Sequence, residues 1–158
     1  MGYGLGAPIP KTITIQASSP NNAIFAPYIL AGGPLVQPTI SSKYPNSKVV
    51  SFDLKSIADG CYAATENGIL APAINCTIRY TATKATGKTV TYDVDYSVGN
   101  VLGIALKAVP VKKHAFPILS FREVTEVKPT IIKAVLPNIL GAVAQMAFDD
   151  MEYDVTLS

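Results

Sequence analysis

The sequence of 158 residues contains no tryptophan, one histidine and two cysteines, and only 15% of its residues are charged. A hydrolase triad needs a histidine beside an activated serine or cysteine, but the single histidine, His114, is flanked by lysines and the chain has no Gly-x-Ser-x-Gly elbow. We therefore interpret His114 as an exposed loop residue. Two thiols are also too few for a structural zinc site. The sequence predicts no catalytic residue and favours a protein that is not an enzyme.

Dense charge and long apolar runs are missing as well. The formal net charge of +2 comes from scattered Lys and Arg residues interleaved with acids, so no stretch is suited to neutralising successive phosphates and nucleic acid is not expected as a partner. No apolar run reaches the roughly 18 to 20 residues that a membrane span needs. Residues 1–6 lack the basic and apolar regions of a signal peptide. We expect residues 1–10 to be a leader or an expression-derived segment and residues 11–158 to form a single domain.

The composition favours strands and turns. The chain is 49% apolar, with 12 prolines and 11 glycines, and it is rich in threonine and valine, which are common in strands. Short alternating segments separated by turn signals predict an all-β fold, a β-sandwich or jelly roll of about 8 to 10 antiparallel strands. One short helix is expected near residues 131–146, where Ala and Leu are good helix formers.

The clearest pattern lies in residues 76–96. Two segments in which apolar and polar residues alternate flank a Lys-Ala-Thr-Gly-Lys turn at residues 84–88. A period of two is typical of strands that are buried on one face only. This pattern predicts a hairpin whose inner face is formed by Ile78, Tyr80, Val90, Tyr92, Val94 and Tyr96.

The two cysteines, Cys61 and Cys76, are predicted to form a disulfide in preference to a reduced buried pair. Closing a loop of this length contributes about 3 kcal/mol in the chain-entropy model. A disulfide implies an oxidising compartment, and hence secretion. Asn75, Cys76 and Thr77 form a glycosylation sequon, but a bridged Cys76 would crowd the acceptor and we do not expect a glycan on Asn75.

Acidic residues gather on two predicted strands. On one strand they are Asp93 and Asp95, and on the last strand they are Asp149, Asp150 and Glu152. Carboxylates suit calcium, so these five residues are metal candidates, and calcium is the only cofactor considered. The favoured alternative is a solvated strand face with cross-strand ion pairs. A pair of acids across a sugar cleft would instead indicate a glycosidase.

The threonine-rich hairpin that begins at a cysteine, with its Lys-x-x-Gly-Lys turn, and the acidic and aromatic segment at residues 148–153 resemble small secreted fungal proteins. Among these are elicitors of plant-pathogenic fungi that induce the hypersensitive response. The resemblance implies a secreted, extracellular, monomeric effector that contributes to virulence by contacting a plant surface receptor or a cell-wall glycan. Two alternatives stay open. One is a carbohydrate-binding or cell-wall-associated module that uses tyrosines and the acidic faces, and the less favoured one is a polysaccharide hydrolase.

Overall fold

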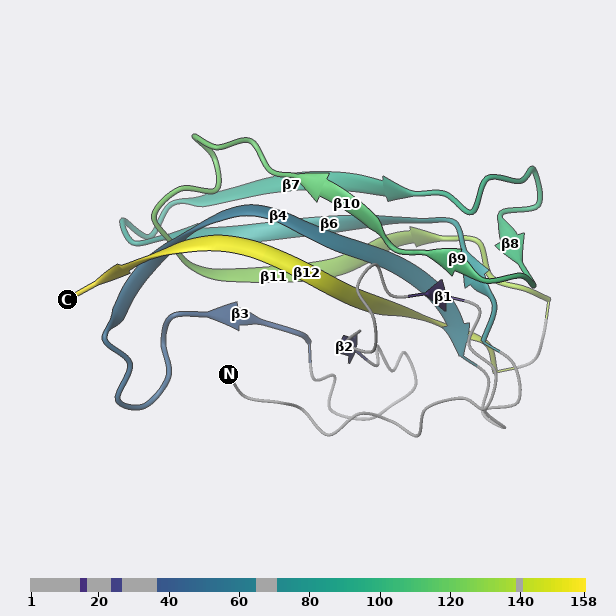
Figure 1. The fold of residues 1–158 in the computed structure, drawn as a ribbon, viewed down its shortest axis with the longest axis horizontal. Coiled ribbons are helices and arrows are strands. Elements are labelled where there is room, and N and C mark those ends of the chain that lie inside the picture. Colours follow the sequence, from purple (N-terminus) through teal and green to yellow (C-terminus); the bar gives the residue numbers. More distant parts are fainter. Residues whose placement is uncertain (1–14, 17–23, 27–36, 65–70, 139–140) are drawn as a thin grey trace.

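The computed structural model describes residues 15–16, 24–26, 37–64, 71–138 and 141–158. Over these residues the chain is all-β, as predicted, with no helix and therefore none that could cross a membrane (Figure 1). The strands are β1 Ile15–Gln16, β2 Ile24–Ala26, β3 Ile40–Ser41, β4 Val49–Ala64, β5 Ala73–Ile74, β6 Cys76–Lys84, β7 Thr89–Tyr96, β8 Ile104–Ala105, β9 Val109–Pro110, β10 Lys112–Ala115, β11 Val124–Ala134 and β12 Val143–Leu157.

One antiparallel sheet contains most of the strands. Its main path runs β2-β12-β4-β11-β6-β7, with β3 paired to β11, β10 and β5 paired to β4, and β8 paired to β5. The two short strands β1 and β9 form a separate parallel pair. The sheet is not closed into a barrel. Its two longest strands, β4 and β12, pair with each other over most of their length.

The sheet folds over between β4 and β11, which share the single residue pair Phe52–Val124. Beyond this point β4 and β6 are not neighbours in the sheet, yet side chains connect them. The predicted disulfide between Cys61 and Cys76 is confirmed and joins the two strands, and the Tyr80 hydroxyl on β6 donates a hydrogen bond to Asp59 on β4. The two halves of the sheet thus enclose the core, as in a β-sandwich.

The predicted hairpin is confirmed, with β6 and β7 paired from Cys76 opposite Tyr96 to Thr83 opposite Thr89. Gly87 closes its turn with a φ of 84°, a left-handed conformation that favours glycine. On the inner face Ile78, Tyr80, Val94 and Tyr96 are buried, and Val90 and Tyr92 are half-buried.

The helix expected near residues 131–146 is wrong for the described part of that range. Residues 131–134 continue β11, and residues 143–146 begin β12. The physical reason is tertiary: β6 and β4 offer paired edges to these residues, and pairing outweighs the weak intrinsic preference of Ala and Leu for a helix. The expected leader, residues 1–10, lies outside the described residues.

Candidate functional site

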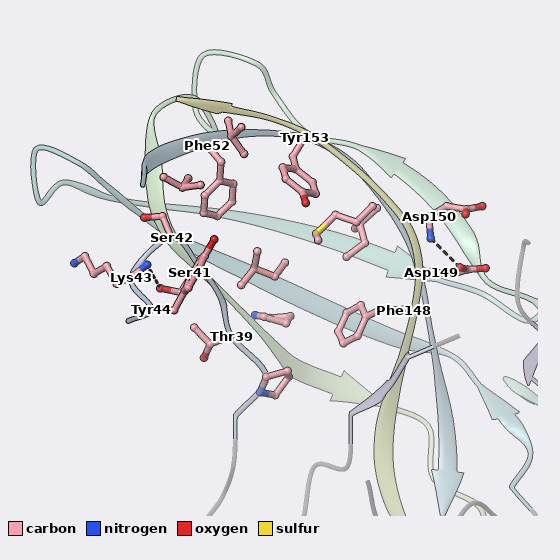
Figure 2. Close-up of a pocket in the computed structure, with 17 residues that line it drawn as sticks. Thr39, Ser41, Ser42, Lys43, Tyr44, Phe52, Phe148, Asp149, Asp150 and Tyr153 are labelled. Atoms are coloured by element: carbon pink, nitrogen blue, oxygen red, sulfur yellow. Dashed lines mark hydrogen bonds between the residues drawn. The ribbon is translucent and has the colours of Figure 1, made fainter. Parts of the chain in front are cut away.

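A pocket of about 480 Å³ lies between β3 and β12 (Figure 2). Because the strand order is β3-β11-β4-β12 and the sheet folds between β11 and β4, the two outer strands of this set approach each other across a gap. The pocket is the open side of the sandwich, and the segment around β3 and the strand β12 form its two walls.

The first wall is held to β11 by hydrogen bonds. The Ser42 amide donates to the Thr125 carbonyl oxygen at 3.0 Å, and Gln37 Nε2 donates to Thr130 Oγ1 at 2.6 Å. These bonds tie both ends of residues 37–42 to the edge of β11, so this wall has a defined position before any ligand binds.

The second wall owes its shape to a bulge in β12. The register of β12 on β4 shifts after Asp149, because Asp150 and Met151 lie opposite the single residue Ile57 of β4. Asp150 has a φ of 40°, which is rare for a residue with a side chain. A bulge of this kind bends a strand and redirects its side chains. Ile57 and Met151 both line the pocket as a result.

The interior of the pocket is apolar and its mouth is aromatic. Phe52, Ile57 and Phe148 are buried, whereas Tyr44 and Tyr153 are 47% and 38% exposed. The Phe52 and Tyr153 rings pack edge to face with centroids 6.4 Å apart. The remaining apolar lining is Pro38, Ile40, Val49, Pro129, Met151 and Val155.

Charged and polar groups stand at the border of the pocket. Figure 2 shows Asp149 and Asp150 on the far side of β12 from the apolar side chains, with the Asp150 amide donating to Asp149 Oδ1 at 2.9 Å. Lys43 is exposed beside Tyr44. A pocket with an apolar interior, a few polar groups at its rim and this volume has the properties of a site for a small apolar or amphipathic molecule.

The predicted acids of the hairpin have other partners. Arg79 Nε and Nη2 each lie 2.8 Å from a carboxylate oxygen of Asp93, and this bidentate bond lowers the pKa of Asp93. Asp95 accepts a hydrogen bond of 2.6 Å from the Thr77 hydroxyl. Asp93 therefore forms a cross-strand ion pair with Arg79, whereas Asp95 forms a cross-strand hydrogen bond with a neutral hydroxyl.

The predicted acids of the last strand are spread around β12. Asp149 is buried at 7% exposure, Asp150 is exposed, and Glu152 accepts bonds from Ser56 Oγ and Lys113 Nζ, each at 3.3 Å. In the part of the chain that the structure describes, no three His, Cys, Asp or Glu residues form a group that could hold a metal ion. The structure thus does not bring the five candidates together.

A buried polar cluster that the sequence did not reveal lies in the core. Asp59 is fully buried and accepts a hydrogen bond of 2.5 Å from the Tyr80 hydroxyl. His114 Nε2 is 3.2 Å from Asp59 Oδ1, but the geometry is not that of a hydrogen bond. Among the described residues, neither of these two buried atoms has a hydrogen-bond partner. The exposed loop position expected for His114 is wrong, because its side chain is only 17% exposed on β10, which pairs with β4.

Burial in the core raises the pKa values of three tyrosines. Burial raises the pKa of Tyr80, and the adjacent Asp59 carboxylate raises it further. Burial and the Asp59 charge raise the pKa of Tyr96 to about 12, and burial raises that of Tyr62, whose hydroxyl donates to Gln145 Oε1 at 2.5 Å. The cluster therefore keeps its phenols protonated, which suits a structural role.

Comparison of the chain with protein-family models, with curated proteins and with solved structures finds no match. The class of protein is therefore defined by the structure alone. It is an all-β protein with one disulfide and with an apolar pocket at the open edge of its sheet.

Proposed function

We propose that the protein is a secreted, non-enzymatic elicitor that binds a component of the plant host or cell wall in the pocket between β3 and β12. The observation that carries the proposal is the apolar interior of this pocket, whose lining also includes the exposed Tyr44 and Tyr153. The disulfide is compatible with an extracellular protein. The elicitor role itself follows from the resemblance of the hairpin sequence.

The pocket favours a ligand with an apolar body and a polar end. Its buried lining residues Phe52, Ile57 and Phe148 have side chains without hydrogen-bonding groups, so affinity would come from burial of apolar surface. The hydroxyl groups of Thr39 and Ser41 and the ammonium group of Lys43 lie along the lining, where they can orient a polar end.

A matched pair of valine variants tests the proposal. Val155 lines the pocket and is 48% exposed, whereas Val50 is 47% exposed on β4 and does not line it. Val155→Trp should fill the mouth without unfolding the chain, and Val50→Trp controls for an added indole. An apolar dye that fluoresces on burial should bind the wild type and Val50→Trp and fail to bind Val155→Trp.

The same proteins are then infiltrated into leaves. Cell death or a defence response to the wild type and Val50→Trp, with a reduced response to Val155→Trp, supports recognition through the pocket. An inactive wild type rejects the elicitor role. Equal responses to both variants reject the pocket as the recognition site while leaving the elicitor role in place.

Carbohydrate binding is the second candidate function, and the two exposed tyrosines at the mouth favour it. Tyr44 and Tyr153 present aromatic rings to solvent, and such rings stack on sugars as well as on apolar ligands. A glycan array separates the two functions. Glycan binding that is lost in Tyr44→Ala and Tyr153→Ala but retained in Val155→Trp would favour a sugar site at the rim over a ligand inside the pocket.

A further inference from the structure

The end of the molecule around β8 exposes a group of aliphatic side chains that the pocket does not involve. Val101 and Leu102 are 103% and 75% exposed, and Leu106 is 71% exposed. Val135 and Leu136, which follow β11, are also exposed. We call these five residues the apolar tip. Figure 1 shows β8 at the end of the molecule opposite the C-terminus.

Asn75 joins the two segments that carry the tip. Its amide donates to the Gly103 carbonyl oxygen at 2.7 Å, and its carbonyl oxygen accepts from the Val135 amide at 2.9 Å. Its side-chain Oδ1 accepts from the Val98 amide at 2.8 Å. A Cβ atom on Gly103 would lie 3.2 Å from Val135 Cγ2, so the two segments that carry these aliphatic side chains are in direct contact.

The loop that presents Val101 and Leu102 is held by its own hydrogen bonds. Asn100 Oδ1 accepts from the Gly103 amide at 2.8 Å, and Asn100 Nδ2 donates to the Ile104 carbonyl oxygen at 2.9 Å. The exposed side chains therefore project from an ordered turn, and little conformational entropy is lost when a partner covers them.

The charges near the tip are mostly positive. Lys107 and Lys133 are exposed on the two segments, and the sequence has no Asp or Glu from residue 96 to 122 or from residue 127 to 148. The hairpin acid at this end, Asp95, is bonded to the Thr77 hydroxyl. Glu66 lies outside the described residues. Such a surface attracts an anionic partner with an apolar layer beneath it.

We propose that the apolar tip inserts into the surface of a lipid bilayer that contains anionic lipids, with Lys107 and Lys133 at the level of the headgroups. A protein partner fits the tip less well. Stable protein interfaces bury about 800 Å² on each side and rely on aromatic and arginine side chains, whereas the tip is a small projection of aliphatic side chains. Aliphatic side chains backed by lysines match the two layers of a membrane surface.

The absence of tryptophan from the chain makes a clean reporter possible. Leu102→Trp places a single indole at the tip. Leu119→Trp is its control, since Leu119 is also exposed, at 82%, but lies by the hairpin turn, where its carbonyl oxygen accepts from Lys84 Nζ. With phosphatidylcholine vesicles that contain phosphatidylserine, the emission of Leu102→Trp should shift to the blue and that of Leu119→Trp should not.

Vesicle sedimentation measures the contributions of the side chains. The double variant Val101→Ser with Leu102→Ser should weaken binding by about tenfold or more, while Ile118→Ser with Leu119→Ser should leave it unchanged. Lys107→Ala and Lys133→Ala should each weaken binding by about fivefold on the mixed vesicles and have no effect on pure phosphatidylcholine.

Three results would overturn the proposal. The first is the absence of a blue shift in the emission of Leu102→Trp, which would favour a protein partner for the tip. The second is an equal shift for Leu119→Trp, because insertion would then not be specific to the tip. The third is equal binding to vesicles with and without phosphatidylserine, which would remove the assigned role of the two lysines. Unfolding temperatures equal to that of the wild type show that the variants fold.

Discussion

The Tyr80 hydroxyl donates a hydrogen bond of 2.5 Å to Asp59 Oδ2 across the core, and both side chains are completely buried. The bond spans two strands, β6 and β4, that are not neighbours in the sheet. A buried carboxylate without its hydrogen bond is costly. This pair, together with the disulfide beside it, therefore holds the two halves of the fold against each other.

Tyr80→Phe should destabilise the protein by about 2 kcal/mol, because it leaves the buried Asp59 carboxylate short of a hydrogen bond. Tyr92→Phe is the matched control, since Tyr92 packs on Phe116 and Phe121 but no hydrogen bond of its hydroxyl is seen among the described residues. Urea unfolding of both variants measures the difference. Equal free energies of unfolding for the two would contradict the role given to the Asp59 bond.

The buried tyrosines predict a loss of stability at high pH. The folded state raises the pKa of Tyr96 from 10.0 to about 12, chiefly by burial, and raises those of Tyr62 and Tyr80 as well. Because the unfolded chain releases these protons first, the stability from their raised pKa values is complete below about pH 10 and declines as the pH rises through the folded values. Urea unfolding at a series of alkaline pH values measures this decline.

Absorbance at alkaline pH provides the control for that prediction. The buried phenols of Tyr62, Tyr80 and Tyr96 have raised pKa values and should ionise only as the chain unfolds. Ionisation of all the tyrosines in one step near pH 10, without unfolding, would refute the burial of Tyr62, Tyr80 and Tyr96.

Removing the disulfide should lower the free energy of unfolding by about 2 to 5 kcal/mol. The double variant Cys61→Ser with Cys76→Ser tests this, and the wild type in reductant provides an independent comparison. The two forms should unfold at similar urea concentrations, both below the oxidised protein. Unchanged stability on reduction would mean that the core alone holds β4 and β6 together.

Asn75 is expected to stabilise the fold through its hydrogen bonds and to carry no glycan. Its side-chain Oδ1 and both of its backbone polar groups are engaged with Val98, Gly103 and Val135, and a Cβ atom on Gly103 would lie 3.0 Å from Asn75 Nδ2. Asn75→Ala should destabilise the protein by about 1 kcal/mol. When the protein is expressed through a eukaryotic secretory pathway, digestion with an N-glycosidase should leave its mass unchanged. A loss of mass from the wild type but not from Asn75→Ala would overturn this expectation.

Some features of the fold could be read directly from the residues. The alternation over residues 76–96 predicted the hairpin and its inner face because one side of a half-buried strand must be apolar. The pairing of Cys61 with Cys76 needed only the count of cysteines and the length of the loop. The all-β class followed from composition and from the frequency of turn signals.

Other features could not be read in this way. Residues 55–64 show no alternation because β4 is buried on both faces over most of this stretch, and a strand covered on two sides loses the period of two. The helix expected near residues 131–146 failed for a related reason, since pairing partners from distant parts of the chain decided the conformation of Ala134 and Val143.

The candidate site depended on tertiary structure almost entirely. The acidic candidates on the two predicted strands, such as Asp93 and Asp150, have different surroundings, whereas Tyr44 and Tyr153, which are far apart in the sequence, both line the pocket. The sequence by itself determined the class of fold, the hairpin and the disulfide, because these depend on local periodicity and on the pairing of two thiols. Only the tertiary structure decided the pocket, the buried Asp59 and the apolar tip, because each of them arises where distant segments of the chain meet.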